Sequence, residues 1–138
     1  MTQKSPDKNI SLLNAFSNEI ISKYGKEFAP RQIIIPEGDT KKEVYVILKG
    51  HAYATTKILT GYKVMGKLGP GEIFGEMAFF DDIPRTATII AKDNVKAIVL
   101  TPENFKEVFE KSPKWALNII NSLCVRISSM LKDISSLY

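Results

Sequence analysis

The sequence contains little of what metal centres and disulfide-linked folds require. It has one cysteine, Cys124, and one histidine, His51. A single cysteine cannot form an internal disulfide, so we expect a reducing, cytoplasmic environment. A single histidine excludes a multi-histidine metal site, and Asp81-Asp82 beside Ile83-Pro84 indicates a polar turn rather than a metal-binding pair. We therefore expect no metal and no cofactor, and we interpret His51 as a hydrogen-bonded or solvent-facing strand residue.

Several other patterns are also missing. The sequence has no Gly-rich loop of the nucleoside-triphosphate hydrolases, no dinucleotide-binding fingerprint and no Gly-x-Ser-x-Gly nucleophile motif. No apolar run is long enough to cross a bilayer, and the first residues lack the apolar core of a signal peptide. The net charge of +4 comes from lysines and arginines scattered along the chain, which indicates a solvated surface. These absences predict a non-catalytic protein with no nucleic-acid and no membrane partner.

The periodicity of the chain changes twice, which divides it into helical ends and a β-rich middle. Apolar residues recur at helical spacing from residue 10 to residue 24, and Gly25 is the expected stop. Strand candidates separated by Gly and Pro turns then cover residues 32–35, 43–49, 51–57, 63–68, 86–91 and 95–101. Thr101-Pro102 and Ser112-Pro113 each place an N-cap before a proline, and they predict two final helices. The even spacing of short strands predicts an antiparallel sandwich or barrel within a single domain.

The segment from Gly71 to Thr88 has the residues best suited to binding a small anion. Gly75 has no Cβ, so the backbone there can approach a ligand closely or adopt a positive φ. The run that begins at Glu76 can form a helical turn whose first N–H groups bind an anion. Glu76 can accept a hydrogen bond from a sugar hydroxyl, and Arg85 offers a fork of donors to two phosphate oxygens. Taken singly, Glu76 and Arg85 would more often form a surface ion pair and Gly75 would more often serve a turn, so it is their combination that indicates a binding site.

The order of residues in this segment resembles the phosphate-binding cassette of cyclic-nucleotide-binding domains, which occur in catabolite activator proteins, cyclic-nucleotide-dependent kinases and cyclic-nucleotide-gated channels. The matching residues are Phe74-Gly75-Glu76-Met77-Ala78 and Pro84-Arg85-Thr86-Ala87-Thr88. The resemblance implies that Glu76 binds the ribose 2′-hydroxyl and that Arg85 binds the exocyclic phosphate oxygens. Backbone amides near Gly75, Met77 and Ala78, with the Thr86 hydroxyl, would complete the phosphate site.

The resemblance also implies a fold. It is a mainly β, eight-stranded antiparallel jelly-roll barrel, or double-stranded β-helix, flanked by an N-terminal helix, a short cassette helix and a long C-terminal helix. On this basis we divide the chain into residues 1–25 (tail and helix), 26–112 (the barrel, with its cassette at 71–88) and 113–138 (a lid and dimerisation helix).

The C-terminal segment has an apolar stripe with alternating steps of three and four residues from Ala116 to Leu137. This pattern favours a parallel two-stranded coil, so we expect a homodimer through this helix. A second apolar row beside the stripe also suits a helix that packs only on its own domain. In the family this helix covers the base, which makes Leu123, Arg126 and Ile127 the candidate base contacts.

The sequence therefore predicts a stand-alone regulatory module, without a DNA-binding domain, that binds a cyclic purine mononucleotide. The expected ligand is cAMP, and Thr86 leaves cGMP open because a hydroxyl at this position often accompanies cGMP tolerance in the family. Binding would be transmitted to the C-terminal helix and to a downstream protein that no motif identifies. Two alternatives stay open, namely the effector-binding part of a transcription factor or channel, and a barrel that no longer binds nucleotide.

Overall fold

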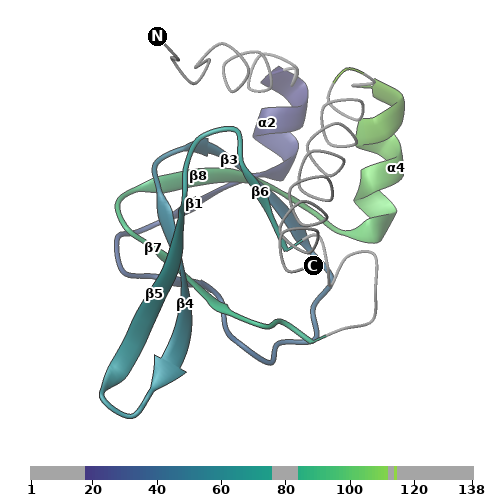
Figure 1. Cartoon of the computed structure of the whole chain (residues 1–138). Coiled ribbons are helices and arrows are strands. Elements are labelled where there is room, and N and C mark those ends of the chain that lie inside the picture. Colours follow the sequence, from purple (N-terminus) through teal and green to yellow (C-terminus); the bar gives the residue numbers. More distant parts are fainter. Residues whose placement is uncertain (1–17, 76–83, 112–113, 115–138) are drawn as a thin grey trace, which may run out of the picture.

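A computed structural model of the chain describes residues 18–75, 84–111 and 114, and Figure 1 shows how the elements in these ranges are arranged. Within these ranges, two helices flank eight short strands. In chain order the elements are α2 (Asn18–Tyr24), β1 (Gly25–Phe28), β2 (Ile33–Ile35), β3 (Val44–Lys49), β4 (Ala52–Ile58), β5 (Gly61–Leu68), β6 (Ile73–Phe74), β7 (Thr88–Ala91), β8 (Val95–Leu100) and α4 (Pro102–Lys111).

The strands form two antiparallel sheets of four, with the orders β1-β8-β3-β6 and β2-β7-β4-β5. Neighbours in each sheet are mostly distant in sequence, as the pairing of β3 with β8 and of β2 with β7 shows. This arrangement is the antiparallel jelly-roll barrel that the sequence predicted, with the end of the N-terminal helix packed beside it. The expected cassette helix and the long helix expected from residue 113 lie outside the described residues. Within the described residues, no helix is long and apolar enough to cross a membrane.

Strands β3 and β8 are buried on both faces because they separate two apolar cores. Alternate side chains point to opposite faces of a strand. On β3, Val44 and Val46 pack against Ile20 of α2 and Val108 of α4. The intervening Tyr45 and Ile47 join the core inside the barrel instead, and that core also includes Phe74, Ile89, Val95, Ala97 and Val99.

Most predicted elements are confirmed, with shifts at their ends. The first helix ends at Tyr24, where Gly25 was the expected stop, while residues 10–17 lie outside the described ranges. Helix α4 begins at Pro102, and the amide of Asn104 donates to the Thr101 hydroxyl at 3.2 Å, which confirms Thr101 as the N-cap. The strand predicted over residues 86–91 starts only at Thr88, because the pairing with β4 extends only to Thr55↔Thr88.

Two strands were not predicted, because neither has a pattern of its own. Strand β1 begins directly after α2 and has no apolar alternation, and its pairing with β8 from Gly25↔Ile98 to Phe28↔Val95 defines it. Strand β6 contains only two residues, Ile73 and Phe74, which is too short to show any period. The alternation rule needs several residues, so it cannot detect a strand that is defined only by its pairing with another strand.

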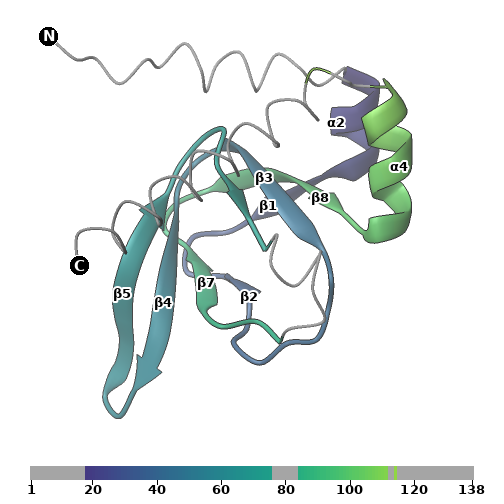
Figure 2. The same ribbon diagram turned by 45° about the vertical axis from the view of Figure 1, so that its right-hand side comes forward.

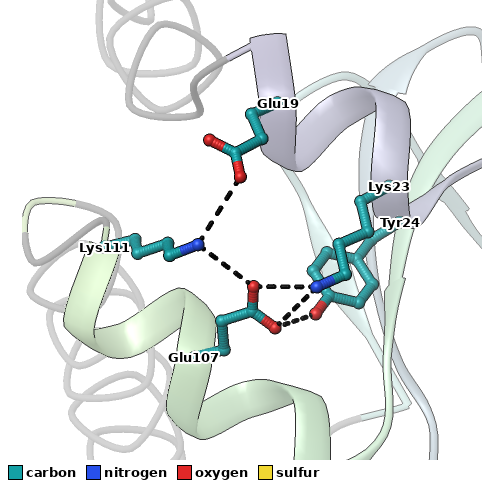
Figure 3. A network of polar contacts seen from close by, with 5 residues as sticks. All are labelled: Glu19, Lys23, Tyr24, Glu107 and Lys111. Atoms are coloured by element: carbon teal, nitrogen blue, oxygen red, sulfur yellow. Dashed lines mark hydrogen bonds and ion pairs between the residues drawn. The ribbon is translucent and has the colours of Figure 1, made fainter.

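A polar network joins α2 to α4 across the outer face of the first sheet (Figure 3). The Glu107 carboxylate of α4 accepts hydrogen bonds from the Tyr24 hydroxyl and from the Lys23 ammonium, the latter at 3.0 and 3.1 Å. Lys111 bridges Glu107 at 3.3 Å and Glu19 at 3.5 Å. The hydrogen bonds from Tyr24 and Lys23 are the largest causes that lower the pKa of Glu107 to about 2.

Candidate functional site

The candidate site lies where three segments far apart in sequence meet, at the start of β3, the end of β6 and the approach to β7. The turn at Pro36–Asp39 holds the third segment in place. The amide of Arg85 donates to the Asp39 carbonyl at 3.0 Å, and the Arg85 carbonyl accepts from the Gly38 amide at 2.8 Å. The amide of Glu37 donates to the Thr88 hydroxyl at 3.0 Å. These bonds fix the backbone on both sides of Arg85.

The Arg85 side chain is buried, with 6% of its surface exposed. Its Nη1 donates to the Gly75 carbonyl at 2.7 Å and its Nη2 to the Glu43 carbonyl at 2.6 Å. Its Nε is buried and has no hydrogen-bond partner among the described residues. None of the carboxylates in the described ranges forms an ion pair with this guanidinium. Two carbonyl oxygens orient the group but leave its charge uncompensated there, and such a site favours an anion.

Gly75 occupies a position that only glycine fits. Its φ is +84°, in the left-handed region. A Cβ at this position would lie 2.8 Å from Arg85 Nη1, 2.8 Å from the Glu43 carbonyl oxygen and 3.5 Å from Tyr45 Cδ1. Both the backbone angle and the close approach of β3 therefore require the absence of a side chain. The Gly75 carbonyl can then accept the Arg85 hydrogen bond.

The ring of Tyr45 forms an apolar surface beside Arg85 and Gly75. Its ring stacks on Phe74 with the centroids 4.8 Å apart and the planes inclined by 4°. Burial raises the pKa of Tyr45 to about 12, with a smaller contribution from the negative charge of Glu43 and an opposing one from Arg85. The phenol is therefore neutral across the physiological range and adds no negative charge near Arg85.

The structure brings together some of the residues that the sequence singled out. Gly75 and Arg85 are in contact, Phe74 is buried in the barrel core, and Ala87 packs against that core. Pro84 and Thr86 are exposed on either side of Arg85. Glu76, Met77, Ala78, Leu123, Arg126 and Ile127 lie outside the described residues.

Sequence reasoning missed Glu43 and Tyr45 as parts of this site. Glu43 contributes its backbone carbonyl, a group that every residue has, so no sequence signal could identify it. Tyr45 had a weak signal, because its place in the strand Val44–Lys49 alternates with the helix-facing Val44 and Val46. That alternation turns its ring into the barrel.

His51 lies just before β4 and is hydrogen-bonded, as expected. Its Nδ1 is 3.0 Å from Asp93 Oδ2, and its backbone amide donates to Asp93 Oδ1 at 2.7 Å. The hydrogen bonds from His51 are the largest causes that lower the pKa of Asp93. Across the part of the chain that the structure describes, no group of three His, Cys, Asp or Glu side chains is placed to hold a metal ion.

A cavity of about 800 Å³ lies near the far end of β3, away from the Arg85 site. It is lined by Glu27, Phe28, Ala29, Gln32, Lys49, Asn94, Val95 and Lys96. None of these residues was predicted to bind the ligand, and neither Gly75 nor Arg85 reaches it. We therefore place the candidate site at Arg85 because of the chemistry of its side chain, and not at the cavity.

Comparison with known proteins identifies the family to which this barrel belongs. Residues 25–112 match the model of the cyclic nucleotide-binding domain. A cAMP-dependent protein kinase regulatory subunit of Yarrowia lipolytica is 34% identical over 79 residues, which cover 57% of this chain and 20% of that protein. A cyclic AMP receptor protein of Thermus thermophilus is 28% identical over 95 residues, 68% of this chain and 44% of that protein. This chain therefore belongs to the cyclic nucleotide-binding domain family.

A solved structure supports the same fold. The catabolite activator protein of Thermus thermophilus superposes with a TM-score of 0.68 at 23% identity, covering 97% of this chain and 60% of that one. The chain thus spans less than half the length of the two curated relatives described above.

Proposed function

We propose that this chain is a non-catalytic regulatory module that binds a cyclic purine mononucleotide, with cAMP preferred, at the site around Arg85 and Gly75. The observation that carries the proposal is the buried Arg85 guanidinium, held by two carbonyl oxygens with no carboxylate partner in the described ranges. The names of the relatives, a cAMP-dependent kinase subunit and a cyclic AMP receptor protein, favour cAMP.

The donors of Arg85 match the charge of a cyclic phosphodiester. A guanidinium has five N–H donors, and the two hydrogen bonds to the carbonyls of Gly75 and Glu43 use two of them. Nε and the remaining Nη protons can donate to the phosphate oxygens of a monoanion. Because the carbonyls already fix the plane of the group, little side-chain entropy remains to be lost when the ligand binds.

The sugar contact and a further phosphate contact follow from the family resemblance. Glu76 would accept the proton of the ribose 2′-hydroxyl, and the exposed Thr86 would lie beside the phosphate. Glu76→Gln should weaken cAMP binding less than loss of Arg85 does, and it should leave the affinity for 2′-deoxy-cAMP unchanged. Calorimetric titration of both ligands tests this role, and equal losses for the two ligands would contradict it.

We further propose that binding is transmitted to the C-terminal helix, and that this helix joins two copies of the chain. The support is the apolar stripe from Ala116 to Leu137. Capture of the phosphate would shift the balance between two packings of this helix, which requires the ligand to prefer one of them. Analytical ultracentrifugation with and without cAMP tests the dimer, and a monomer at tens of micromolar in both conditions would remove this part of the proposal.

A thermal-shift panel with cAMP, cGMP, AMP and no ligand tests the binding itself. A ligand that binds only the folded state stabilises it by about 2.7 kcal/mol at one hundred times its dissociation constant. We expect the largest shift with cAMP, a smaller one with cGMP and none with AMP, whose phosphate is a dianion without the ring. The absence of any shift with both cyclic nucleotides would identify a barrel that no longer binds nucleotide.

A further inference from the structure

The hairpin formed by β4 and β5 exposes apolar side chains at its turn and on both of its faces. Leu59, in the turn, is fully exposed, and the other exposed apolar side chains of the hairpin are Ile58 (45% exposed), Tyr62 (46%), Val64 (53%) and Met65 (64%). Figures 1 and 2 both show this turn on the side of the molecule away from α2 and α4. Exposed apolar side chains gathered at a projecting hairpin indicate an interaction surface.

The charged residues of the hairpin itself are all basic. Lys57, Lys63 and Lys67 are exposed, and the sequence from Val44 to Gly71 contains no Asp or Glu. In the hairpin register Lys57 pairs with Tyr62 and Thr56 pairs with Lys63, so these two lysines lie directly behind the apolar turn. The surface therefore fits a partner that is both negatively charged and able to accept apolar side chains.

The free edge of β5 is poorly suited to pairing with another strand. Within the described sheet β5 is an edge strand, and Lys63, Lys67 and the register shift opposite Ala54/Thr55 interrupt that edge. Lysines and bulges are the means by which edge strands avoid pairing. A second copy would also bring lysines of like charge together. These features disfavour a partner strand and leave the turn as the contact.

We propose that the β4–β5 hairpin is a membrane-contacting loop that binds anionic lipid surfaces. Ile58 and Leu59 would enter the boundary between headgroups and acyl chains, with Tyr62 at the interface and Lys57 and Lys63 on the headgroups. Interfacial elements bury their apolar side chains about 5–10 Å deep, which is the length of about two to three strand residues. The absence of a bilayer-spanning run does not bear on this contact, because a peripheral loop needs none.

Co-sedimentation of the whole chain with lipid vesicles tests the proposal. We expect binding to vesicles of phosphatidylcholine with phosphatidylserine, little binding to phosphatidylcholine alone, and weaker binding at high salt. Leu59→Ser should weaken binding by about tenfold or more. Lys57→Gln with Lys63→Gln should weaken it by roughly thirtyfold, since each lysine near an anionic surface contributes about fivefold.

Matched controls come from exposed residues elsewhere on the chain. Ile33→Ser on β2, where Ile33 is 46% exposed, and Lys106→Gln on α4 should leave vesicle binding unchanged. Because the Leu59 side chain is fully exposed, its variant should give the same circular dichroism melting curve as the parent. The proposal is overturned if vesicles with phosphatidylserine do not bind, or if Leu59→Ser and Ile33→Ser bind equally. It is also overturned if Leu59→Ser dissociates a dimer in lipid-free sedimentation, which would make the turn an interface between copies.

Discussion

Substitution of Gly75 by alanine tests the geometry of the candidate site most sharply. Gly75 and Gly38 have nearly the same φ, +84° and +83°, so alanine at either position costs about 1–2 kcal/mol for the left-handed backbone. At Gly38 a Cβ meets nothing within 4 Å, whereas at Gly75 it lies 2.8 Å from the Glu43 carbonyl oxygen. That oxygen belongs to the backbone and cannot swing away.

The overlap at Gly75 should add about 1–3 kcal/mol, the usual range for overpacking a tight site. Gly38→Ala should therefore lose about 1–2 kcal/mol of unfolding free energy and Gly75→Ala about 2–5 kcal/mol in urea titrations followed by circular dichroism. Gly50→Ala should show the same kind of added loss, because the φ of Gly50 is +87° and a Cβ there would lie 2.2 Å from the Asn94 carbonyl oxygen. Equal losses for Gly38→Ala and Gly75→Ala would refute the close approach of β3 to Gly75.

Two further predictions concern α4. Thr101→Ala removes the cap that accepts from the Asn104 amide at 3.2 Å, and it should lower the unfolding free energy by about 1 kcal/mol. The pKa of Glu107 is lowered from its ordinary 4.5 to about 2 by the hydrogen bonds from Tyr24 and Lys23. The stability that this carboxylate contributes is complete above pH 4.5 and is lost as the pH falls toward 2, so the parent should lose more stability than Glu107→Gln between urea titrations at pH 5 and pH 3.

Exposed residues of the same types provide the controls. Thr40→Ala should leave the urea midpoint where it is, and a loss equal to that of Thr101→Ala would rule out a capping role. Glu110→Gln, on the same helix as Glu107, should follow the parent's pH dependence. If Glu107→Gln also follows it, the network of Figure 3 does not couple α2 to α4 in solution.

The sequence predicted the parts of the fold that have a repeating pattern of their own. Strand β3 was recognised because its apolar run is bounded by turn residues, and α4 because Thr101-Pro102 begins a helix in a well-defined way. Strand β1 was missed since its four residues become a strand only through their register with β8. A local pattern predicts the strands and helices that are recognisable from their own residues. A strand such as β1 is recognisable only when the distant strand that pairs with it is known.

The candidate site was likewise predicted only in part. Gly75 and Arg85 were predicted from their side chains, or the lack of one, and the structure places them in contact. The burial of the guanidinium and the roles of Glu43 and Tyr45 were not predicted. They depend on the start of β3 reaching the end of β6, a juxtaposition that the barrel creates and that no short motif encodes.

Calorimetric titration of cAMP into the parent, Arg85→Ala and Arg85→Lys tests the central claim most directly. Arg31→Lys, at an exposed arginine, is the control, and urea titrations establish that each variant is folded at the temperature used. Loss of a partner to a buried charge costs about 2–5 kcal/mol, so Arg85→Ala should bind cAMP roughly thirty- to several-thousand-fold more weakly. Arg85→Lys keeps the charge but loses the forked pair of N–H donors, so its affinity for cAMP should lie between those of Arg85→Ala and the parent. Arg31→Lys should bind cAMP as the parent does. A folded Arg85→Ala variant with the parent's dissociation constant would contradict the assignment of the site.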